Sequence, residues 1–161
     1  MDLRGKFKYI FFDADDTLWE NERYFRAAEK KFAALLSDYT SPEGVQEMLW
    51  HKQEDNIPLF GYGSKTYMIG MTDAAMELCG GQLPKHIYYG IKKIITDLAF
   101  HELEIIEGVE ETLQALQGHY KLIVATKGDL PEQMGKFRKS GLERYFHHCE
   151  VMENKDEKNY L

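Results

Sequence analysis

The sequence predicts an α/β protein in which a core with a parallel sheet carries an inserted all-α module. Short apolar runs that end in polar turn formers alternate with helical patterns in the first and last parts of the chain. This alternation favours parallel strands joined by right-handed helical crossovers. Between the first two apolar runs, from about Glu22 to about Phe100, the pattern is helical throughout, and this block is too long for an ordinary crossover.

The first strand is predicted at Tyr9–Phe12, a continuous apolar run that is rich in aromatic residues. Such a run is typical of a strand that is buried on both faces, as in a parallel sheet. Three aspartates follow within four positions, Asp13, Asp15 and Asp16. They can form a turn and cap a helix, which we expect of Asp16, or they can carry chemistry.

Four amphipathic patterns make up the helical block. They cover, in order, residues 25–36, 42–52, 64–78 and 84–98. Ser41 is an expected N-cap because Pro42 follows at the first helical position, and Ser64 is an expected N-cap of the third helix. Gly80–Gly81 is expected to end that third helix.

The pattern of the last part returns to strands and helices in alternation. A helix is predicted from Gly108, a strand over Tyr120–Ala125, a helix from Pro131 to Gly141 and a strand over His148–Met152. A polar, helix-like segment, Asn154–Leu161, follows.

Composition limits the classes of function. The 161 residues include 27 acidic and 20 basic ones, for a net charge of −7, which argues against binding to nucleic acid and to anionic membranes. The sequence has no apolar stretch as long as a membrane span and no signal-like segment, so we expect a cytoplasmic protein. Cys79 and Cys149 are expected to be reduced thiols.

Reactive side chains follow the predicted strands. Asp13 and Asp15 follow the first strand, Thr126 and Lys127 follow the second, and Lys155 follows the third. Ligands of open parallel sheets bind at the carboxyl ends of the strands, so these side chains can converge on one crevice. Two carboxylates, a hydroxyl and a lysine are what phosphoryl transfer through a carboxylate nucleophile requires.

These residues divide the work by chemistry. One carboxylate attacks phosphorus and must stay ionised, which a Mg²⁺ ion and a lysine would favour. A second carboxylate two residues on would protonate the leaving oxygen and later deprotonate water. The hydroxyl and free backbone N–H groups would hold the phosphoryl oxygens.

The ordered set resembles the haloacid dehalogenase-like hydrolase superfamily. Asp13-Ala14-Asp15-Asp16-Thr17-Leu18 is similar to its first motif, and Thr126 matches its second, a Thr or Ser at a strand end. Ser140–Phe146 resembles the segment before the third strand, and Lys155 lies where the third-motif lysine is expected, with Lys158 as the alternative.

The resemblance implies a Rossmann-like core of residues 1–19 and 104–161 with an α-helical cap, residues 20–103, between two hinges. Asp13 would be the nucleophile and a Mg²⁺ ligand, and Asp15 would be the general acid/base, with its backbone carbonyl on Mg²⁺. Thr126 and Lys155 would bind phosphate. Lys127 stands where the family often has Asn, and its charge could serve the same end.

The expected function is therefore a Mg²⁺-dependent phosphatase of a small phosphorylated metabolite, with a nucleoside monophosphate as one candidate. A phosphomutase and a non-catalytic phosphate-binding module are the alternatives. The acidic fourth motif of the family is not found before Leu161. We therefore expect a C-terminally incomplete core in which Tyr9–Phe12 is an edge, with both other strands on one side of it.

Overall fold

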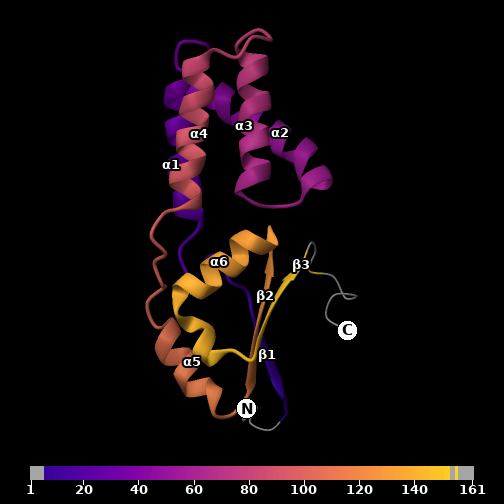
Figure 1. Ribbon diagram of the computed structural model, residues 1–161, viewed down its shortest axis with the longest axis vertical. Helices are drawn as coiled ribbons and strands as arrows, with labels where there is room; N and C mark the ends of the chain where they lie inside the picture. Colours follow the sequence, from indigo (N-terminus) through magenta and orange to yellow (C-terminus); the bar gives the residue numbers. More distant parts are fainter. Residues whose placement is uncertain (1–5, 153–154, 156–161) are drawn as a thin grey trace. The chain divides into compact units, whose positions relative to one another are not determined.

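The computed structural model describes residues 6–152 and Lys155, and the chain divides into two compact units (Figure 1). Residues 1–22 and 102–161 form the first, which we call the sheet unit, and residues 23–101 form the second, the helical unit.

The sheet unit contains a parallel sheet with the strand order β1-β2-β3 (Figure 1). Its elements are β1 (Tyr9–Phe12), α5 (Val109–Gln117), β2 (Lys121–Lys127), α6 (Leu130–Ser140), the 3₁₀ helix η1 (Leu142–Tyr145) and β3 (His148–Met152). The α/β class and the parallel sheet are confirmed. Helices precede β2 and join β2 to β3, as connections between neighbouring parallel strands require.

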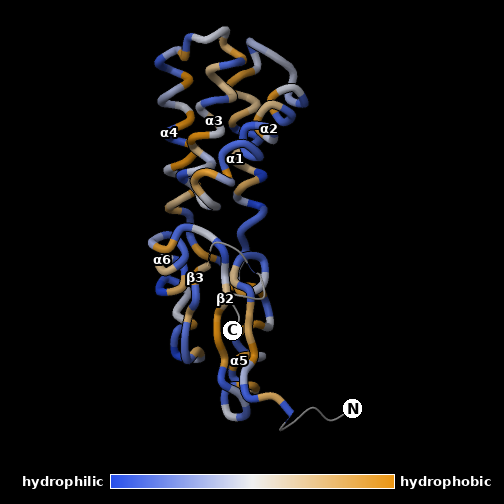
Figure 2. Tube along the Cα trace, turned by 90° about the vertical axis from the view of Figure 1, so that its right-hand side faces the viewer, coloured by the Kyte–Doolittle hydropathy of each residue, from blue (hydrophilic) through white to orange (hydrophobic). Residues whose placement is uncertain are grey.

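The central strand β2 carries the core of this unit. Leu122 and Val124 are fully buried, and they pack with Leu113 of α5, Phe137 of α6 and Leu142 of η1. β2 is hydrophobic along its middle, as the tube in Figure 2 shows. A strand of this composition is stable only where helices cover it, so α5 and α6 fix β2, and β2 in turn fixes its two neighbours.

The edge strand β1 is less buried than its apolar sequence predicts. Tyr9 and Phe11 are 44 % and 48 % exposed, so the expectation that this strand is buried on both faces is wrong for the described residues. Within residues 6–152 and Lys155, β1 pairs with β2 alone, so it is an edge strand, as the predicted strand order implies. The expectation that both other strands lie on one side of it is confirmed.

The second strand is longer than predicted. β2 continues to Lys127, so Thr126 and Lys127 are its last two residues and do not follow it. They pair with Val151 and Met152 of β3, which supplies the backbone partners that extend the strand. The helix-like segment predicted at Asn154–Leu161 lies outside the described residues, apart from Lys155.

Two connectors of the sheet unit are hydrogen-bonded to each other. The amide of Glu20 donates to the carbonyl oxygen of Glu104 at 2.9 Å, and the amide of Ile106 donates to that of Leu18 at 3.1 Å. Trp19 and Ile105 form an antiparallel bridge between these two bonds. The chain thus leaves the sheet unit and re-enters it along one paired ribbon.

The helical unit consists of four helices around one apolar core. They are α1 (Glu22–Leu35), α2 (Pro42–Phe60), α3 (Ser64–Leu78) and α4 (Lys85–Ala99). The first residue of α1, Glu22, belongs to the sheet unit. The core contains five fully buried large side chains, Phe32, Leu36, Met71, Ile87 and Ile91. Among the described residues, no helix combines the length and apolar character needed to cross a membrane.

The helix termini test the predicted caps. The Ser41 side chain accepts a hydrogen bond from the amide of Gly44, so that N-cap is confirmed. Ser64 is not an N-cap: it is the first residue of α3 and is buried, and Gly63 with φ +139° takes the capping position. α2 extends beyond the predicted range, through Pro58 to Phe60.

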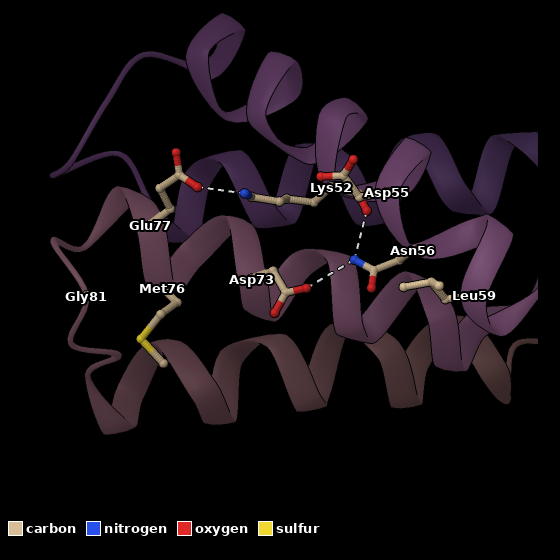
Figure 3. A pocket seen from close by; sticks show the side chains of 8 residues that line it. All are labelled: Lys52, Asp55, Asn56, Leu59, Asp73, Met76, Glu77 and Gly81. Atoms are coloured by element: carbon tan, nitrogen blue, oxygen red, sulfur yellow. Dashed lines mark hydrogen bonds and ion pairs between the residues drawn. The ribbon is translucent and has the colours of Figure 1, made fainter.

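A polar pocket of about 370 Å³ lies along α2 and α3 (Figure 3). Asn56 is buried in it and donates from its amide nitrogen to the carbonyl oxygen of Lys52 and to Asp73, at 2.8 and 3.0 Å. The Lys52 ammonium lies 2.6 Å from a carboxylate oxygen of Glu77, and this hydrogen bond raises the pKa of Lys52. The polar groups of the pocket therefore link α2 to α3.

Both cysteines are free thiols, as expected. Burial raises the pKa of Cys149 to about 11, with a further contribution from the charge of Glu150. Because the thiolate is the reactive form, this shift of the pKa disfavours the reactive form of Cys149 near neutral pH.

The core of the helical unit makes a stability prediction. Replacing the fully buried Leu36 with Ala should lower the free energy of unfolding by about 2–5 kcal/mol, because the side chain leaves a cavity. Leu59→Ala is the matched control, since Leu59 is 73 % exposed, and it should have little effect. Urea denaturation followed by circular dichroism measures both, and equal losses would contradict the assigned core.

Candidate active site

The predicted site residues gather at the carboxyl ends of the three strands. β1 ends at Phe12, which pairs with Val124, so Asp13 begins the turn beside the last residues of β2. Thr126 and Lys127 end β2. Since the strands are parallel, all three ends face the same edge of the sheet, where an open α/β fold binds its ligands.

Asp13 is paired with Lys155. The Lys155 ammonium donates to Oδ1 of Asp13, and the two side chains are 25 % and 46 % exposed. The structure thus brings together two residues that lie 142 positions apart. Because nearly half of the Asp13 side chain is exposed, its carboxylate remains accessible to solvent and to a ligand. The alternative lysine, Lys158, lies outside the described residues.

Asp15 is held by three donors. The indole nitrogen of the buried Trp19 donates to Oδ1 at 2.7 Å, and the ammonium of Lys136 donates to the same oxygen at 3.0 Å. The side-chain amide of Gln133 donates to Oδ2 at 3.0 Å. Every partner is a donor, so the surroundings are matched to an acidic side chain that accepts hydrogen bonds.

Gln133 joins Asp15 to the end of β2. Its side-chain nitrogen also lies 2.7 Å from the hydroxyl oxygen of Thr126 and 3.1 Å from the carbonyl oxygen of Lys127, so its two N–H groups are shared among three acceptors. Thr126 and Gln133 are both buried, with 3 % of each exposed. Lys127 contributes its backbone carbonyl oxygen to this network. One amide thus links Asp15 to the phosphate-binding residue that the sequence predicts.

Asp16 forms a turn, as expected. Its carboxylate accepts hydrogen bonds from the amides of Asn21 and Glu22 at 2.9 Å, where α1 begins. Its φ of +58° lies in the left-handed region, which Asp tolerates better than most residues. The third carboxylate of the motif is thus structural, and it shapes the loop that presents the other two.

Sequence reasoning missed Gln133 and Lys136. They are one helical turn apart on α6, and both contact Asp15, more than 100 positions away in sequence. One signal was available: Gln133 is four residues before Phe137 and so shares its buried face. A polar side chain on an apolar helical face needs a buried partner.

The donor set suits a hard cation only in part. Carboxylate and carbonyl oxygens are the ligands that Mg²⁺ prefers, and Mg²⁺ keeps several waters in most sites. The half-exposed Asp13 carboxylate and the backbone carbonyl of Asp15 fit that demand, whereas the Asp15 carboxylate already accepts three hydrogen bonds. Across residues 6–152 and Lys155, no cluster of three or more metal-binding side chains occurs.

An open parallel sheet that presents an aspartate pair, a threonine and a lysine at its carboxyl edge defines a hydrolase-type α/β site. The model of the haloacid dehalogenase-like hydrolase family matches residues 7–157, so the chain belongs to that family. The matched range covers both units, including every predicted site residue. No curated protein matches the sequence significantly.

Solved structures of the family resemble the chain. A haloacid dehalogenase-like family hydrolase from Xanthomonas campestris is 36 % identical with a TM-score of 0.89, over 95 % of this chain and 64 % of that one. A putative hydrolase from Bacillus subtilis bound to magnesium is 18 % identical (TM-score 0.53, 90 % and 63 % covered). A 2-haloacid dehalogenase from Pseudomonas syringae is 21 % identical (TM-score 0.51, 89 % and 63 % covered). The last two show the fold alone. The chain spans less than two thirds of each of these structures.

The turn between β2 and α6 makes a prediction for Gly128. Its φ is +139°, and a Cβ there would lie 3.0 Å from Cγ of Gln133. Gly128→Ala should therefore destabilise the fold by about 1–3 kcal/mol, as expected of a strained backbone, and displace Gln133. Gly118→Ala is the control, because Gly118 is the C-cap of α5 with φ −75° and ψ −13°, angles that Ala adopts, and has open space around it, so the change should cost nothing. Thermal unfolding of both variants provides the measurement, and equal stability would contradict the geometry of this turn.

Proposed function

We propose that the protein is a Mg²⁺-dependent phosphatase that hydrolyses a small phosphoric monoester through a phosphorylated Asp13. The observation that carries this proposal is the pairing of Asp13 with Lys155, directly beside an Asp15 surrounded by donors. A carboxylate nucleophile needs a nearby cation to hold it ionised and to offset the charge of the phosphate.

The first step transfers the phosphoryl group to the protein. Oδ of Asp13 attacks phosphorus, the bond from phosphorus to the ester oxygen breaks, and Asp15 gives its proton to the leaving oxygen. The ammonium of Lys155 and the hydroxyl of Thr126 bind phosphoryl oxygens as the charge shifts among them. This step releases the alcohol and leaves an acyl phosphate on Asp13.

The second step restores the carboxylate. Water attacks phosphorus of the acyl phosphate, Asp15 accepts its proton, and phosphate leaves as Asp13 regains its charge. Asp15 thus holds a proton in one half of the cycle and releases it in the other. Asp13 and the backbone carbonyl of Asp15 would hold the Mg²⁺ ion, which neutralises phosphate charge when it is bound.

Asp15 also favours a phosphatase over a dehalogenase. Cleavage of a carbon–halogen bond releases a halide, which needs no proton, so a residue placed to protonate an alkoxide has no task there. The hydrogen bonds that hold Asp15 would then contribute nothing to the reaction. We propose a small phosphorylated metabolite as the substrate class, and we propose that the helical unit is a cap that determines substrate selectivity.

Asp13→Asn should abolish hydrolysis of phosphoric monoesters while the protein stays folded, because an amide is a poor nucleophile. Phosphate release from a generic aryl phosphate with added Mg²⁺ measures this loss. Asp16→Asn is the matched control: Asn also adopts positive φ and caps helices, so turnover should stay near that of the parent. Near-parental turnover of Asp13→Asn would remove Asp13 from the mechanism.

Asp15→Asn should slow breakdown of the phosphorylated protein by about 10²–10⁴-fold, as expected for a lost general base. Rapid-quench experiments with a ³²P-labelled monoester should show the label persisting on the protein in this variant. A variant that forms and loses the label at the parental rates would show that Asp15 transfers no proton.

A further inference from the structure

One face of α6 is built around Asp15. Gln133 and Lys136 are three residues apart, so their side chains project from the same side of the helix. Both reach the carboxyl group of Asp15, at 3.0 Å each, and they approach different oxygens of it. The helix thus holds the carboxyl group at two points, which fixes both its position and its rotation.

The orientation of the Gln133 amide follows from its partners. The Lys127 carbonyl oxygen can only accept, so the nitrogen of the amide must face the network. That nitrogen also donates to the hydroxyl oxygen of Thr126, at 2.7 Å. The Thr126 hydroxyl in turn donates to the Lys127 carbonyl oxygen at 3.4 Å, a long bond whose proton can be donated to a phosphoryl oxygen once one is bound.

Lys136 holds the opposite side of Asp15. Its ammonium donates to Oδ1 of Asp15 and, at 2.9 Å, to the side-chain oxygen of Asn21, and the lysine side chain is 14 % exposed. Glu132, one turn earlier on α6, lies 3.9 Å from the same ammonium. An ammonium with three acidic or amide oxygens around it has little freedom to move.

The donors occupy the two oxygens of Asp15 unequally. Oδ1 accepts from both Trp19 and Lys136, whereas Oδ2 accepts from Gln133 alone. A carboxyl group offers about four acceptor positions, two on each oxygen. The remaining position is therefore on Oδ2, and a transferable proton at Asp15 belongs there.

We propose that Gln133 and Lys136 are positioning residues that aim Oδ2 of Asp15 at the leaving oxygen of the substrate. This inference rests on the proposed phosphatase function, in which Asp15 protonates that oxygen. With Oδ1 occupied by two donors and Oδ2 held by one, only one rotation of the carboxyl group satisfies the whole set. Loss of either residue frees that rotation and misdirects the proton.

The test is how the rate of phosphoryl transfer depends on the leaving group. Lys136→Met and Gln133→Leu keep the approximate size of each side chain and remove its donors. In single-turnover experiments with the full chain, both variants should transfer phosphate from alkyl monoesters about 10²-fold more slowly, the low end of a general-acid contribution. Transfer from p-nitrophenyl phosphate, whose leaving group needs little protonation, should fall much less. In Gln133→Leu the lost contact to Thr126 lowers the rate for every ester by a common factor, so the readout is the dependence on the leaving group. The logarithm of the rate should then fall more steeply with leaving-group basicity than in the parent.

The comparison of substrates distinguishes a loss of positioning from a loss of folded protein. An unfolded fraction lowers the rate for every ester by the same factor and leaves the steepness unchanged. Lys139→Met is the matched control, because this exposed lysine is on the same helix one turn further on, and its dependence should equal that of the parent.

The outcomes separate the two proposals. A parent that hydrolyses none of the esters overturns the proposed phosphatase function, and this inference with it. A parent that is active, with variants whose leaving-group dependence equals its own, overturns the positioning role alone. Equal steepening in Lys139→Met would also overturn it, because the effect would then be general to α6.

Discussion

The crowding of negative charge at the end of β1 is the constraint on which the sheet unit depends. Three carboxylates within four residues repel one another, and each needs its own donors if the loop is to stay folded. Asp13 meets the ammonium of Lys155, and Asp16 meets two backbone amides at the start of α1. Asp15 is held by side chains from its own loop and from α6.

This division of partners explains why distant segments must meet. The residues that satisfy Asp13 and Asp15 come from the chain after β3 and from the helix after β2, and only a parallel sheet brings those segments to one edge. The tight turn at Gly128 starts α6 close enough to β2 for Gln133 to reach back to Thr126. The fold and the site are therefore products of the same contacts.

The sequence predicted what depends on local pattern and on strand order. The Asp13–Asp15 pair and Thr126 were identifiable because each follows or ends an apolar run, and parallel strands put those ends together. The place of Gln133 on the buried face of α6 indicates that it needs a polar partner, but nothing local identifies partners of Gln133 and Lys136 that lie 118 and 121 residues away. The four apolar residues of β1 alone predicted burial, whereas the strand order predicted an edge, and the exposure of Tyr9 and Phe11 agrees with the strand order. Ser64 has a typical capping residue type, but α3 begins at Ser64 itself, and Gly63 occupies the capping position.

The paired ribbon between Leu18–Glu20 and Glu104–Ile106 has a consequence for how such a chain can be assembled. Because the two connectors are hydrogen-bonded to each other, the helical segment between them is a loop whose two ends are already held together. The entropic cost of closing a loop grows only slowly with its length, so the ribbon would tolerate a segment of very different size in its place. The helical unit is in this sense exchangeable: a segment of another length between the two connectors is compatible with the same sheet, the same aspartates and the same α6.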